Sequence, residues 1–452
     1  MSSLALSMIV RDAAETLEAC LASVRGVVNE MVLADTGSAD GTIALAQRLG
    51  ARVVSIPWTN DFAEARNRAM AEVRSDWVLL LDADEILDPE RAPTIPGLLN
   101  DSSAGGYQVS IRNYVLSLED RVWDRPAVPN DSSLAAARPY PAYVEHQNVR
   151  LFRRNPEVYF VGRVHESVGP RLQQLGRNIA EAPFWIHHFG LAASAKERER
   201  KNLLYRELGS QKIREMPEDA QAHFELGLVE MDNFGNLEKA RALFERACQL
   251  NPCLGVAWFF QGVALARQEK FAAAIACLAQ AERQGHRTAL VAEVRGDAFY
   301  NSGSYAEAAR AYKTALQREP STPIFESKMG LAVLRSGQAP RGLRLMRHAL
   351  AIRSAAPELH DRLIVALVWL GNLEEAAVAA EAKLGAVALP AANDFLRAAS
   401  LWAQVRDSHR ATATLRDGLL VHPGDGRLRE AWNALTQPSK DKEISTTGKS
   451  VT

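Results

Sequence analysis

The sequence predicts two structural classes in one chain, an α/β domain with a parallel, doubly wound sheet and then an all-α solenoid of helical repeats. The α/β prediction rests on strand and helix patterns that alternate from Leu4 to Asp84. The solenoid prediction rests on glycines that recur every 34 residues from Gly262 onward. The length of 452 residues agrees with more than one domain, because a single hydrophobic core rarely extends so far.

Short apolar runs in the first part of the chain are typical of strands buried in a parallel sheet, and the segments between them have apolar residues at helical spacing. The predicted strands are Leu4 to Val10, Glu30 to Ala34, Arg52 to Ile56 and Val78 to Leu81. The predicted helices are Ala13 to Val24, Asp40 to Leu49 and Phe62 to Val73. This alternation predicts consecutive βα units in a doubly wound half-sheet.

The sequence changes character beyond Pro89. Prolines at positions 126, 129, 139 and 141 and the Asn-Asp-Ser-Ser stretch at 130–133 predict a long functional loop and not a core element. Strand patterns return at 149–152, 158–161 and 184–187, and the first domain is expected to cover residues 1–192. Residues 193–216 are strongly charged and helical in pattern, which predicts a solvated helical linker.

The glycine spacing in the second half has the period of tetratricopeptide repeats, each of which is a pair of helices. The two glycine series with this spacing are Gly262, Gly296 and Gly330, and Gly303, Gly337 and Gly371. Small residues at such positions let two helices approach closely. About six repeats are therefore expected over 217–435, the first with an extra residue in its inter-helix turn, and then a disordered polar tail over 436–452.

The composition excludes several classes of protein. A formal net charge of −1 argues against a protein built mainly to bind nucleic acid or an anionic membrane. No apolar run is long enough to span a bilayer, so no transmembrane segment is expected. The four cysteines have no metal-ligand spacing, and no signal-peptide pattern begins the chain. A reducing, cytoplasmic location is therefore expected.

The stretch WVLLLDADE, residues 77–85, contains the first candidate site. Its apolar run predicts a buried strand that brings Asp82 and Asp84 to the carboxyl end of the sheet, where open α/β sheets bind their ligands. Two carboxylates one residue apart can share Mg²⁺ or Mn²⁺, since both cations prefer oxygen ligands. The alternative is a pair of turn and cap residues before a helical start at Pro89.

Two upstream stretches offer further ligand-binding groups. In LADTGSADGT, residues 33–42, Asp35 ends a predicted strand and can accept hydrogen bonds from a nucleoside. The alternative for Asp35 and Asp40 is to cap the turn and the following helix, and we favour that role for Asp40 only. In NDFAEARNRAM, residues 60–70, Arg66 and Asn67 lie one turn into a helix. The guanidinium of Arg66 can hold a diphosphate or orient an acid of the 77–85 stretch, the alternative being a surface charge.

The segments LALSMIVRD, MVLADTGSADGT, FAEARNRAM and WVLLLDADE, in this order within residues 4–90, resemble the nucleotide-sugar domain of family 2 glycosyltransferases, which has the Rossmann-like GT-A fold. The resemblance implies a nucleoside diphosphate sugar as donor, commonly a UDP-sugar, Mn²⁺ or Mg²⁺ as cofactor, and transfer with inversion. By the same resemblance, Asp82 faces the ribose or sugar and Asp84 ligates the metal. Thr36 departs from the pattern, because many members have a second acid there, and this leaves the base contact open. The expected donor-binding residues are Val10, Arg11, Asp12, Asp35, Thr36, Arg66, Asn67, Asp82 and Ala83.

The stretches VRLFRRNPEVYFVGRVHESV, residues 149–168, and WIHHFG, residues 185–190, resemble the second half of those family members that have tetratricopeptide repeats. An inverting transfer needs one carboxylate to take the proton of the acceptor while the metal neutralises the departing diphosphate. Glu166 is the first candidate for this base, and Arg66 and Asp82 complete the expected catalytic set. The rival bases are Asp124, Asp131, Glu145 and Glu85.

Histidines in the same stretches are candidate metal ligands. His165 and His188 can each complete a metal shell, and a hydrogen-bonded structural histidine is an equally good interpretation of both. His187 is expected to point away from His188 if the segment is extended. Of these two neighbours, His188 is the expected ligand.

These features together predict a metal-dependent inverting glycosyltransferase whose repeats recruit the acceptor, either a protein, a peptide or a glycan, or a partner protein. The alternative is a non-catalytic scaffold, in which the repeats are the working part and the first domain only binds a nucleotide sugar or is inactive. Asp35, Asp82 and Asp84 count against the scaffold, which does not need them. A nucleotidyltransferase is weaker, because no glycine-rich, lysine-containing phosphate loop lies near the N-terminus.

Overall fold

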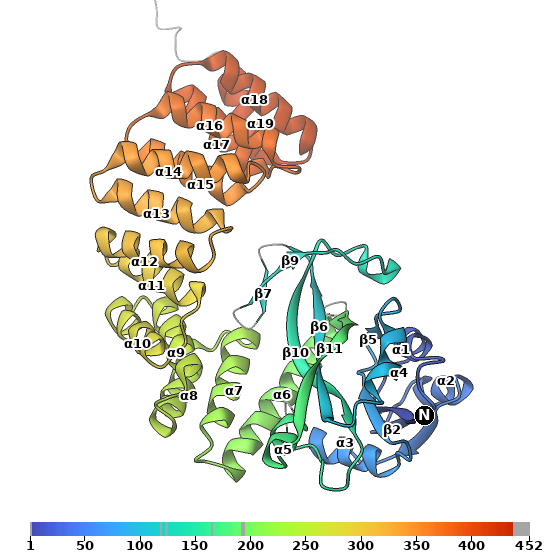
Figure 1. Cartoon of the computed structure of the whole chain (residues 1–452). Helices are drawn as coiled ribbons and strands as arrows, with labels where there is room; N and C mark the ends of the chain where they lie inside the picture. Colours follow the sequence, from blue (N-terminus) through green and yellow to red (C-terminus); the bar gives the residue numbers. More distant parts are fainter. Residues whose placement is uncertain (1, 118–119, 123–124, 164–165, 191–194, 437–452) are drawn as a thin grey trace, which may run out of the picture. The chain divides into compact units, whose positions relative to one another are not determined.

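The computed structural model describes residues 2–117, 120–122, 125–163, 166–190 and 195–436 (Figure 1). Its contacts divide the chain into two compact units, Met1–Leu250 and Asn251–Thr452, and each unit is considered by itself. The first unit is built on a mixed sheet and the second is entirely helical, so the predicted fold class is confirmed. Within the described residues, no helix has the length and apolar character needed to cross a membrane.

The four strands predicted in the first part of the chain are present and pair in parallel. They are β1 (Leu4–Val10), β2 (Glu30–Asp35), β3 (Arg52–Ser55) and β4 (Trp77–Leu80). The intervening helices are α1 (Leu17–Ser23), α2 (Thr42–Arg48) and α3 (Phe62–Ala71). The sheet order in this half is β3-β2-β1-β4, which brings the carboxyl ends of β1, β2 and β4 to one edge.

Alternate residues of β1 face two different hydrophobic cores. Leu4, Leu6 and Met8 pack with residues of α1 and α2 on one side of the sheet. Ala5 packs on the other side in a cluster that includes Met70 of α3. Because side chains alternate along a strand, a continuous apolar run such as LALSMIV is buried on both faces.

The second half of the sheet corrects the expectation of a long loop after Pro89. Two strands of 12 residues each, β6 (Ala104–Val115) and β10 (Ala142–Arg153), pair antiparallel with one another, and β10 also pairs with β4. β11 (Asn178–His188) runs parallel to β6, and the short β5 (Glu85–Leu87) pairs antiparallel with β11. Figure 1 shows β6, β10 and β11 as the long strands of the domain. Polar residues interrupt the apolar pattern of β6 and β10, and for this reason their sequences resemble loops.

Further differences concern short elements. The strand expected at 158–161 is absent from the described chain, where only an isolated bridge joins Val161 to Ser167. The remaining short elements of this domain are η1 (Ala92–Thr94), α4 (Ile95–Leu98), β7 (Arg121–Val122), β8 (Arg125–Pro126), β9 (Val128–Pro129), η2 (Ala135–Ala137) and α5 (Gly169–Gln174).

The helices after the sheet belong to the same compact unit. The charged stretch expected to be a linker forms one helix of 21 residues, α6 (Ala195–Glu215). It is followed by α7 (Ala220–Leu228), the π-helix η4 (Val229–Asn233) and α8 (Leu237–Leu250). This π-helix lies between the two helices of the first repeat, where the sequence predicts one extra residue. It also buries Glu230, whose carboxylate accepts hydrogen bonds from Arg206 and Lys239.

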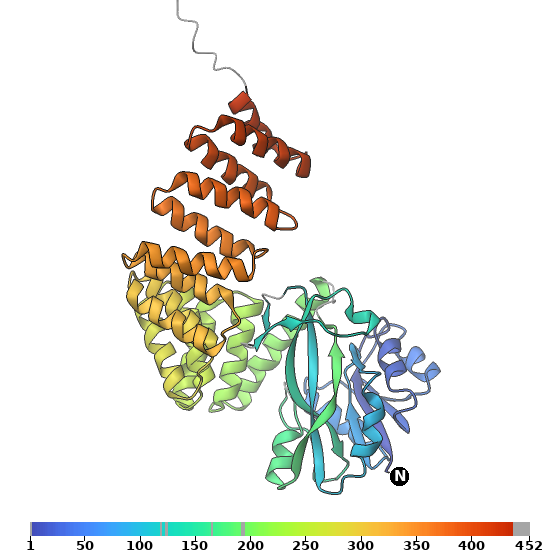
Figure 2. The same ribbon diagram turned by 45° about the horizontal axis from the view of Figure 1, so that its top comes forward.

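The second unit is a stack of antiparallel helix pairs, seen most clearly in Figure 2. Its helices are α9 (Gly255–Arg267), α10 (Phe271–Arg283), α11 (Ala289–Asn301), α12 (Tyr305–Arg318), α13 (Pro323–Arg335), α14 (Ala339–Ile352), α15 (Pro357–Trp369), α16 (Leu373–Ala386), α17 (Ala392–Gln404), α18 (Ser408–Val421) and α19 (Gly426–Thr436). A Cβ at Gly296 would lie 2.6 Å from the ring of Tyr312, so close helix approach explains the first glycine series. Gly303 of the second series has a φ of +81°, which explains glycine at the turn between paired helices.

Candidate active site

A cavity of about 950 Å³ opens in the first unit beside the carboxyl ends of β1, β2 and β4. This is the position at which open α/β sheets bind ligands, and the volume suits a nucleotide-sized molecule. Its lining residues are Ile9, Val10, Arg11, Asp12, Ala13, Glu15, Thr16, Thr36, Asp40, Trp58, Phe62, Ala83, Asp84, Phe189, Gly190, Lys201 and Leu204. Six of the residues expected to bind the donor or the metal are in this set, namely Val10, Arg11, Asp12, Thr36, Ala83 and Asp84.

The acidic turn is held by two buried arginines. Arg66 Nη2 donates to Asp82 Oδ1 at 2.7 Å, and Arg150 Nη2 lies 3.4 Å from Asp82 Oδ2. Arg150 Nη2 also lies 2.8 Å from Glu85 Oε1. Burial opposes the charge of Asp82, but the two guanidinium groups outweigh it and hold the pKa of this carboxyl well below its usual range. Asp82 is therefore an anion with a set orientation.

Arg66 joins the acidic turn to the expected base. Its Nε lies 2.5 Å from Glu166 Oε1, while its Nη2 contacts Asp82. Burial alone would lower the pKa of Arg66, and the two carboxylates raise it instead. The remaining nitrogen, Nη1, is buried without a hydrogen-bond partner. The sequence-predicted catalytic set of Glu166, Asp82 and Arg66 is thus one contiguous cluster.

Glu85 lies beneath this cluster and is almost fully buried. Its Oε2 accepts a hydrogen bond of 2.8 Å from the backbone N–H of Asp82, which shapes the turn. Burial raises the pKa of Glu85, and the negative charge of Asp82 adds to this effect while Arg150 opposes it. Because Glu85 is enclosed by these partners, it supports the turn and does not line the cavity.

Asp84 points the other way, into the cavity, beside His188. Asp84 Oδ2 lies 3.3 Å from His188 Nε2. Burial opposes the charged imidazolium, but the carboxylate of Asp84 outweighs burial and raises the pKa of His188. Gly190 closes over the pair: a Cβ at this position would lie 2.6 Å from His188 Nε2 and 3.2 Å from Asp84 Oδ2. The space beside these two ligand atoms therefore exists because residue 190 has no side chain.

Asn113 of β6 determines the tautomer of His188. Its Nδ2 lies 3.0 Å from the backbone oxygen of Val144, which can only accept, and 2.8 Å from His146 Nδ1. Its Oδ1 must then face His188 Nδ1, at 2.8 Å, and accept a hydrogen bond from it. In a neutral ring the lone pair of Nε2 consequently faces Asp84. Two electron-rich atoms 3.3 Å apart repel one another, and either a proton on Nε2 or a metal cation removes this repulsion.

A divalent cation fits this donor set. Among the residues that the structure describes, no group of three His, Cys, Asp or Glu side chains could hold a metal, so Asp84 and His188 offer two ligands. Mg²⁺ and Mn²⁺ bound at nucleotide sites commonly take one or two protein ligands and complete their shell with phosphate and water. The glycine-lined space and the exposed lone pair both agree with such a cation.

The two other histidines have different outcomes. His187 is fully buried on the opposite face of β11, where its Nε2 contacts Asp88 Oδ2 at 2.9 Å and its Nδ1 contacts the hydroxyl of Tyr114 at 2.8 Å. His187 is thus a hydrogen-bonded structural histidine that points away from His188, as the extended segment predicted. His165 lies outside the described residues.

Two acidic side chains in the turn after β2 accept hydrogen bonds from nearby backbone N–H groups. The carboxylate of Asp35 is 2% exposed and accepts hydrogen bonds from the backbone N–H groups of Gly37 and Ser38, at 3.0 and 3.1 Å. It does not line the cavity, and its nucleoside role stays a prediction. Asp40 Oδ1 accepts a hydrogen bond of 2.9 Å from the backbone N–H of Thr42, the first residue of α2, and Asp40 also borders the cavity.

The loop after β1 has a strained residue at the cavity. Asp12 has a φ of +47°, a left-handed conformation that is unusual for a residue other than glycine. Its Oδ1 accepts a hydrogen bond of 2.7 Å from the N–H of Ala39, which ties this loop to the turn after β2. Strained backbone at a cavity is common in ligand sites, in agreement with the expected donor contact.

Other predicted residues are engaged elsewhere. Asn67 forms two hydrogen bonds with the backbone of Phe160, at 3.0 and 2.7 Å, so its amide holds the segment after β10 in place. Among the rival bases, Asp131 pairs with Arg112 at 2.8 Å and Glu145 accepts a hydrogen bond of 2.7 Å from Ser110. Asp124 lies outside the described residues.

Helix α6 was missed as part of the site, because its charged sequence reads as a linker. Lys201 and Leu204 of α6 line the cavity. Tyr205 lies beside Phe62, with ring centroids 6.4 Å apart, and Phe62 packs edge-on against Trp58 at 4.8 Å. Asn113 was missed for a related reason, since β6 reads as loop. Neither Lys201 nor Asn113 lies in a motif that could be recognised from the sequence.

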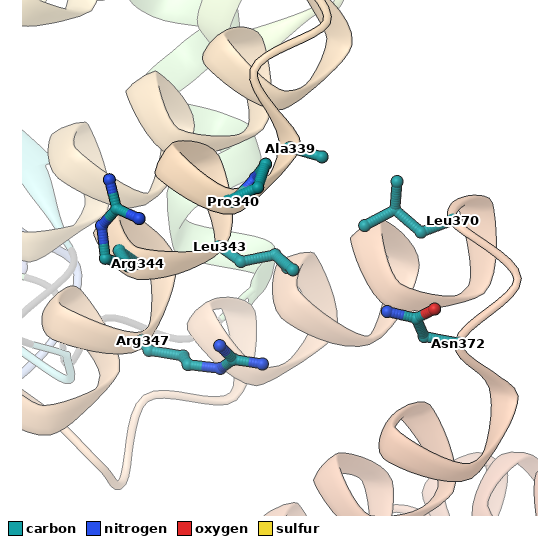
Figure 3. A pocket seen from close by; sticks show the side chains of 7 residues that line it. All are labelled: Ala339, Pro340, Leu343, Arg344, Arg347, Leu370 and Asn372. Atoms are coloured by element: carbon teal, nitrogen blue, oxygen red, sulfur yellow. The ribbon is translucent and has the colours of Figure 1, made fainter.

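A second hollow, of about 450 Å³, lies on the repeats beside α14 and the turn from α15 to α16 (Figure 3). Leu343 and Leu370 face it, together with Arg344 and Arg347. Arg347 is already paired with Glu375 of α16. The lining contains no carboxylate and no nucleophile, so this hollow is part of the repeat surface and lacks the chemistry of a catalytic centre.

Comparison with known proteins supports both halves of the chain. Residues 6–159 match the family described as glycosyl transferase family 2, and residues 204–252 and 261–330 match tetratricopeptide repeat families. A TPR repeat-containing protein of Synechococcus elongatus is 31% identical over 236 residues, which cover 50% of this chain and 52% of that protein. An uncharacterized glycosyltransferase of Rickettsia felis is 32% identical over 90 residues, which cover 20% of this chain and 31% of that protein.

The match to each relative is partial, since the chain spans about half the length of the Synechococcus protein and less than a third of the Rickettsia one. A tetratricopeptide repeat protein from Parabacteroides merdae aligns over 54% of this chain and 98% of its own, at 11% identity and a TM-score of 0.41, which is too weak to define a shared fold. The chain therefore has a family 2 glycosyltransferase domain in its N-terminal part, matched over residues 6–159, and this domain is followed by tetratricopeptide repeats.

Proposed function

We propose that the protein transfers a sugar, with inversion and with Mn²⁺ or Mg²⁺, from a nucleoside diphosphate sugar, expected to be UDP-linked, to a protein, peptide or glycan acceptor recruited by its repeats. The observation that supports this best is the cavity at the carboxyl edge of the sheet, where the loop after β1 meets the Asp84–His188 pair under Gly190. A scaffold would have no use for a buried charge network that sets the orientation of the acidic turn.

The roles proposed for the donor side follow from these contacts. Asp84 and His188 hold the cation, which supplies positive charge to the diphosphate as it leaves. Asp82 cannot turn toward a metal without leaving Arg66 and Arg150, so it is assigned to the ribose or sugar side. The loop at Arg11 and Asp12 contacts the nucleoside.

The proton of the acceptor is assigned to Glu166. The acceptor hydroxyl forms a bond to the anomeric carbon, the bond from this carbon to the diphosphate oxygen breaks, and the hydroxyl proton passes to the carboxylate. Arg66 holds Glu166 Oε1 at 2.5 Å, which orients the carboxylate and leaves Oε2 as the oxygen assigned to accept the proton. The nucleoside diphosphate keeps the bonding electrons.

The surface proposed to recruit the acceptor lies on α15. Val365, Val368 and Trp369 are exposed apolar residues at helical spacing on this helix. The guanidinium of Arg335 lies 5.0 Å from the ring of Trp369 and 4.7 Å from that of Tyr305, so a cation borders the apolar stripe. An exposed stripe of this kind suits an extended or helical polypeptide.

The test is a screen of nucleoside diphosphate sugars for Mn²⁺-dependent binding and donor hydrolysis with the full chain. Asp84→Ala is compared with the native protein, and Glu157→Ala, which changes an exposed acid outside the cavity, is the matched control. Loss of binding and hydrolysis in Asp84→Ala alone supports the enzyme. If the native chain binds and hydrolyses no donor and Asp84→Ala changes nothing, the scaffold interpretation replaces it.

A further inference from the structure

We propose that Lys201 of α6 binds the diphosphate of the donor, so that the helix leading into the repeats completes the donor site. This inference rests on the proposed function, since it assigns a further residue to the same cavity. Neither the family match, which ends at residue 159, nor the repeat matches, which begin at 204, covers this residue.

The first observation is the charge of the cavity lining. Four carboxylates border the cavity, those of Asp12, Glu15, Asp40 and Asp84, against two cations, Arg11 and Lys201. A diphosphate adds further negative charge, so binding it requires positive charge beyond what the lining provides without a metal. Arg11 Nε already lies 3.8 Å from Asp12 Oδ2. Within the described part of the chain, Lys201 forms no ion pair with a carboxylate, and its ammonium lies 5.8 Å from the centre of the Tyr205 ring at the border of the cavity.

The second observation is the position of Lys201 relative to the acidic turn. The pKa of Lys201 is raised by Tyr205 and by the carboxylates of Asp84 and Asp82, although burial opposes the charge. These carboxylates influence the ammonium without pairing with it. Asp84 and Lys201 line the same cavity, so a diphosphate bound to a cation at Asp84 would be within the space that the ammonium also borders. An ammonium is a compact charge that binds phosphate well.

The third observation is that α6 is firmly held. Leu208 is fully buried, and Lys212 lies 2.9 Å from Glu225 of α7. Arg206 donates to the buried Glu230 of η4 through both Nε and Nη2, at 2.8 and 2.9 Å. The first helix pair of the repeats therefore positions Lys201, which a solvated linker could not do.

The chemistry explains why an ammonium on a firmly held helix is useful here. When the bond to the anomeric carbon breaks, the electron pair stays on the diphosphate oxygen, whose negative charge increases. A cation already in place stabilises this charge without reorganisation. The expected contribution is therefore to diphosphate affinity and to the rate of transfer, and not to recognition of the nucleoside.

The experiment measures binding of nucleoside diphosphates and the corresponding nucleosides to the full chain by calorimetry, with UDP, GDP, ADP and CDP as probes and Mn²⁺ present. Lys201→Met is compared with Lys201→Arg and with Arg214→Met, which removes an exposed cation from the same helix about 20 Å further along its axis. Lys201→Met is expected to weaken diphosphate binding about tenfold or more, because a charged hydrogen bond is lost. Nucleoside binding should not change, Lys201→Arg should restore most of the affinity, and Arg214→Met should bind as the native chain does.

The outcomes separate this inference from the proposed function. If the native chain binds a diphosphate, Asp84→Ala weakens it and Lys201→Met binds as tightly as native, the role of Lys201 is wrong and the enzyme stands. If no probe binds the native chain, the proposed function itself fails. Equal loss of nucleoside and diphosphate binding in Lys201→Met would mean that the helix is displaced and would also overturn the inference. Tyr205→Phe keeps the aromatic ring and leaves the ammonium of Lys201 in place, so it should retain diphosphate binding.

Discussion

Asn113 Oδ1 lies 2.8 Å from His188 Nδ1, and this contact decides which nitrogen of the imidazole faces Asp84. The amide cannot rotate by half a turn, because its Nδ2 must donate to the backbone oxygen of Val144. In a neutral imidazole the lone pair of His188 Nε2 is therefore directed toward Asp84 Oδ2, and in the imidazolium that Asp84 favours, the N–H of Nε2 donates to this oxygen. Outer partners of this kind commonly set the orientation and basicity of a metal-binding histidine.

Asn113→Ala should weaken Mn²⁺ binding in the presence of a nucleoside diphosphate by about 10- to 100-fold, since the ring loses the acceptor that fixes its tautomer. Calorimetry or the electron paramagnetic resonance signal of free Mn²⁺ measures this affinity. Gln147→Ala, which removes an exposed cross-strand amide contact of the same sheet, is the control and should leave the affinity unchanged. Native Mn²⁺ affinity in Asn113→Ala would exclude the role of Asn113.

Gly190→Ala should abolish metal binding and displace His188. The added methyl would meet Nε2 at 2.6 Å, closer than any real carbon contact, and would occupy the space beside Asp84. Gly97→Ala is the matched control in the same unit, because a Cβ there meets nothing within 4 Å. A crystal structure of Gly190→Ala that shows an unmoved imidazole and a bound Mn²⁺ would contradict the assignment of the metal site.

Glu166→Gln should reduce transfer to the acceptor by about 10²- to 10⁴-fold while leaving donor affinity nearly unchanged, because the amide keeps the shape and cannot accept the proton. Donor affinity and acceptor transfer are measured separately, by calorimetry and by product formation. Glu145→Gln, which changes a rival carboxylate on β10, is expected to keep transfer within a few-fold of native. The reverse pattern would assign the base to Glu145.

Trp369→Ala should raise the KM for the acceptor about tenfold without changing donor hydrolysis. Trp369 is 55% exposed, and the guanidinium of Arg335 lies 5.0 Å from its ring. Tryptophan and arginine are the residues that most often contribute strongly to binding when a partner covers them. Leu389→Ala removes an apolar side chain that is 81% exposed between α16 and α17, and it should have no effect. Unchanged acceptor kinetics in Trp369→Ala would remove α15 from the recruiting surface.

His146 predicts a pH dependence of stability. Burial, with a smaller contribution from Arg150, lowers the pKa of His146 from its ordinary value of 6.5 to about 4. The unfolded chain then binds a proton at this site at higher pH than the folded chain does. The contribution of His146 to the free energy of unfolding is therefore fully present above pH 6.5 and is lost as the pH decreases from 6.5 toward 4. The expected loss is about 2 kcal/mol between pH 7 and pH 5.

The measurement for His146 is the urea midpoint of the first unit, followed by pulsed deuterium labelling of peptides from β6 and β10, at both pH values. His146→Gln keeps an acceptor for Asn113 Nδ2 and does not titrate, so it should lose less stability than native on acidification. An equal loss in both proteins would show that other groups cause the acid sensitivity.

The first half of the sheet could be predicted because its information is local. A strand such as β1 is buried on both faces, so its apolar run is continuous, and the carboxyl end of β4 necessarily presents Asp82 and Asp84. The strands β6 and β10 could not be recognised in the same way. Polar residues such as Gln108, Arg112 and Glu145 interrupt their apolar pattern, and their pairing joins segments far apart in sequence.

In the candidate site, too, some residue roles could be predicted from the sequence and others could not. Asp84 and His188 were both expected as metal ligands, yet Asp35 and Asn67, which were expected to bind the donor, direct their polar atoms to neighbouring backbone groups. A sequence motif states which side chains are available at a strand end. It does not state which of them the backbone uses, because hydrogen-bond partners come from other segments.

The sequence by itself determined that an α/β domain is followed by helical repeats, because hydrophobic period and glycine spacing are properties of short segments. It also determined that the acidic turn at Asp82 and Asp84 stands at the ligand-binding edge of the sheet. Only the tertiary structure decided that Arg66 and Arg150 hold Asp82, that Asn113 and Gly190 prepare His188, and that α6 brings Lys201 to the cavity. These relationships join segments separated by tens of residues, and only folding brings them into contact.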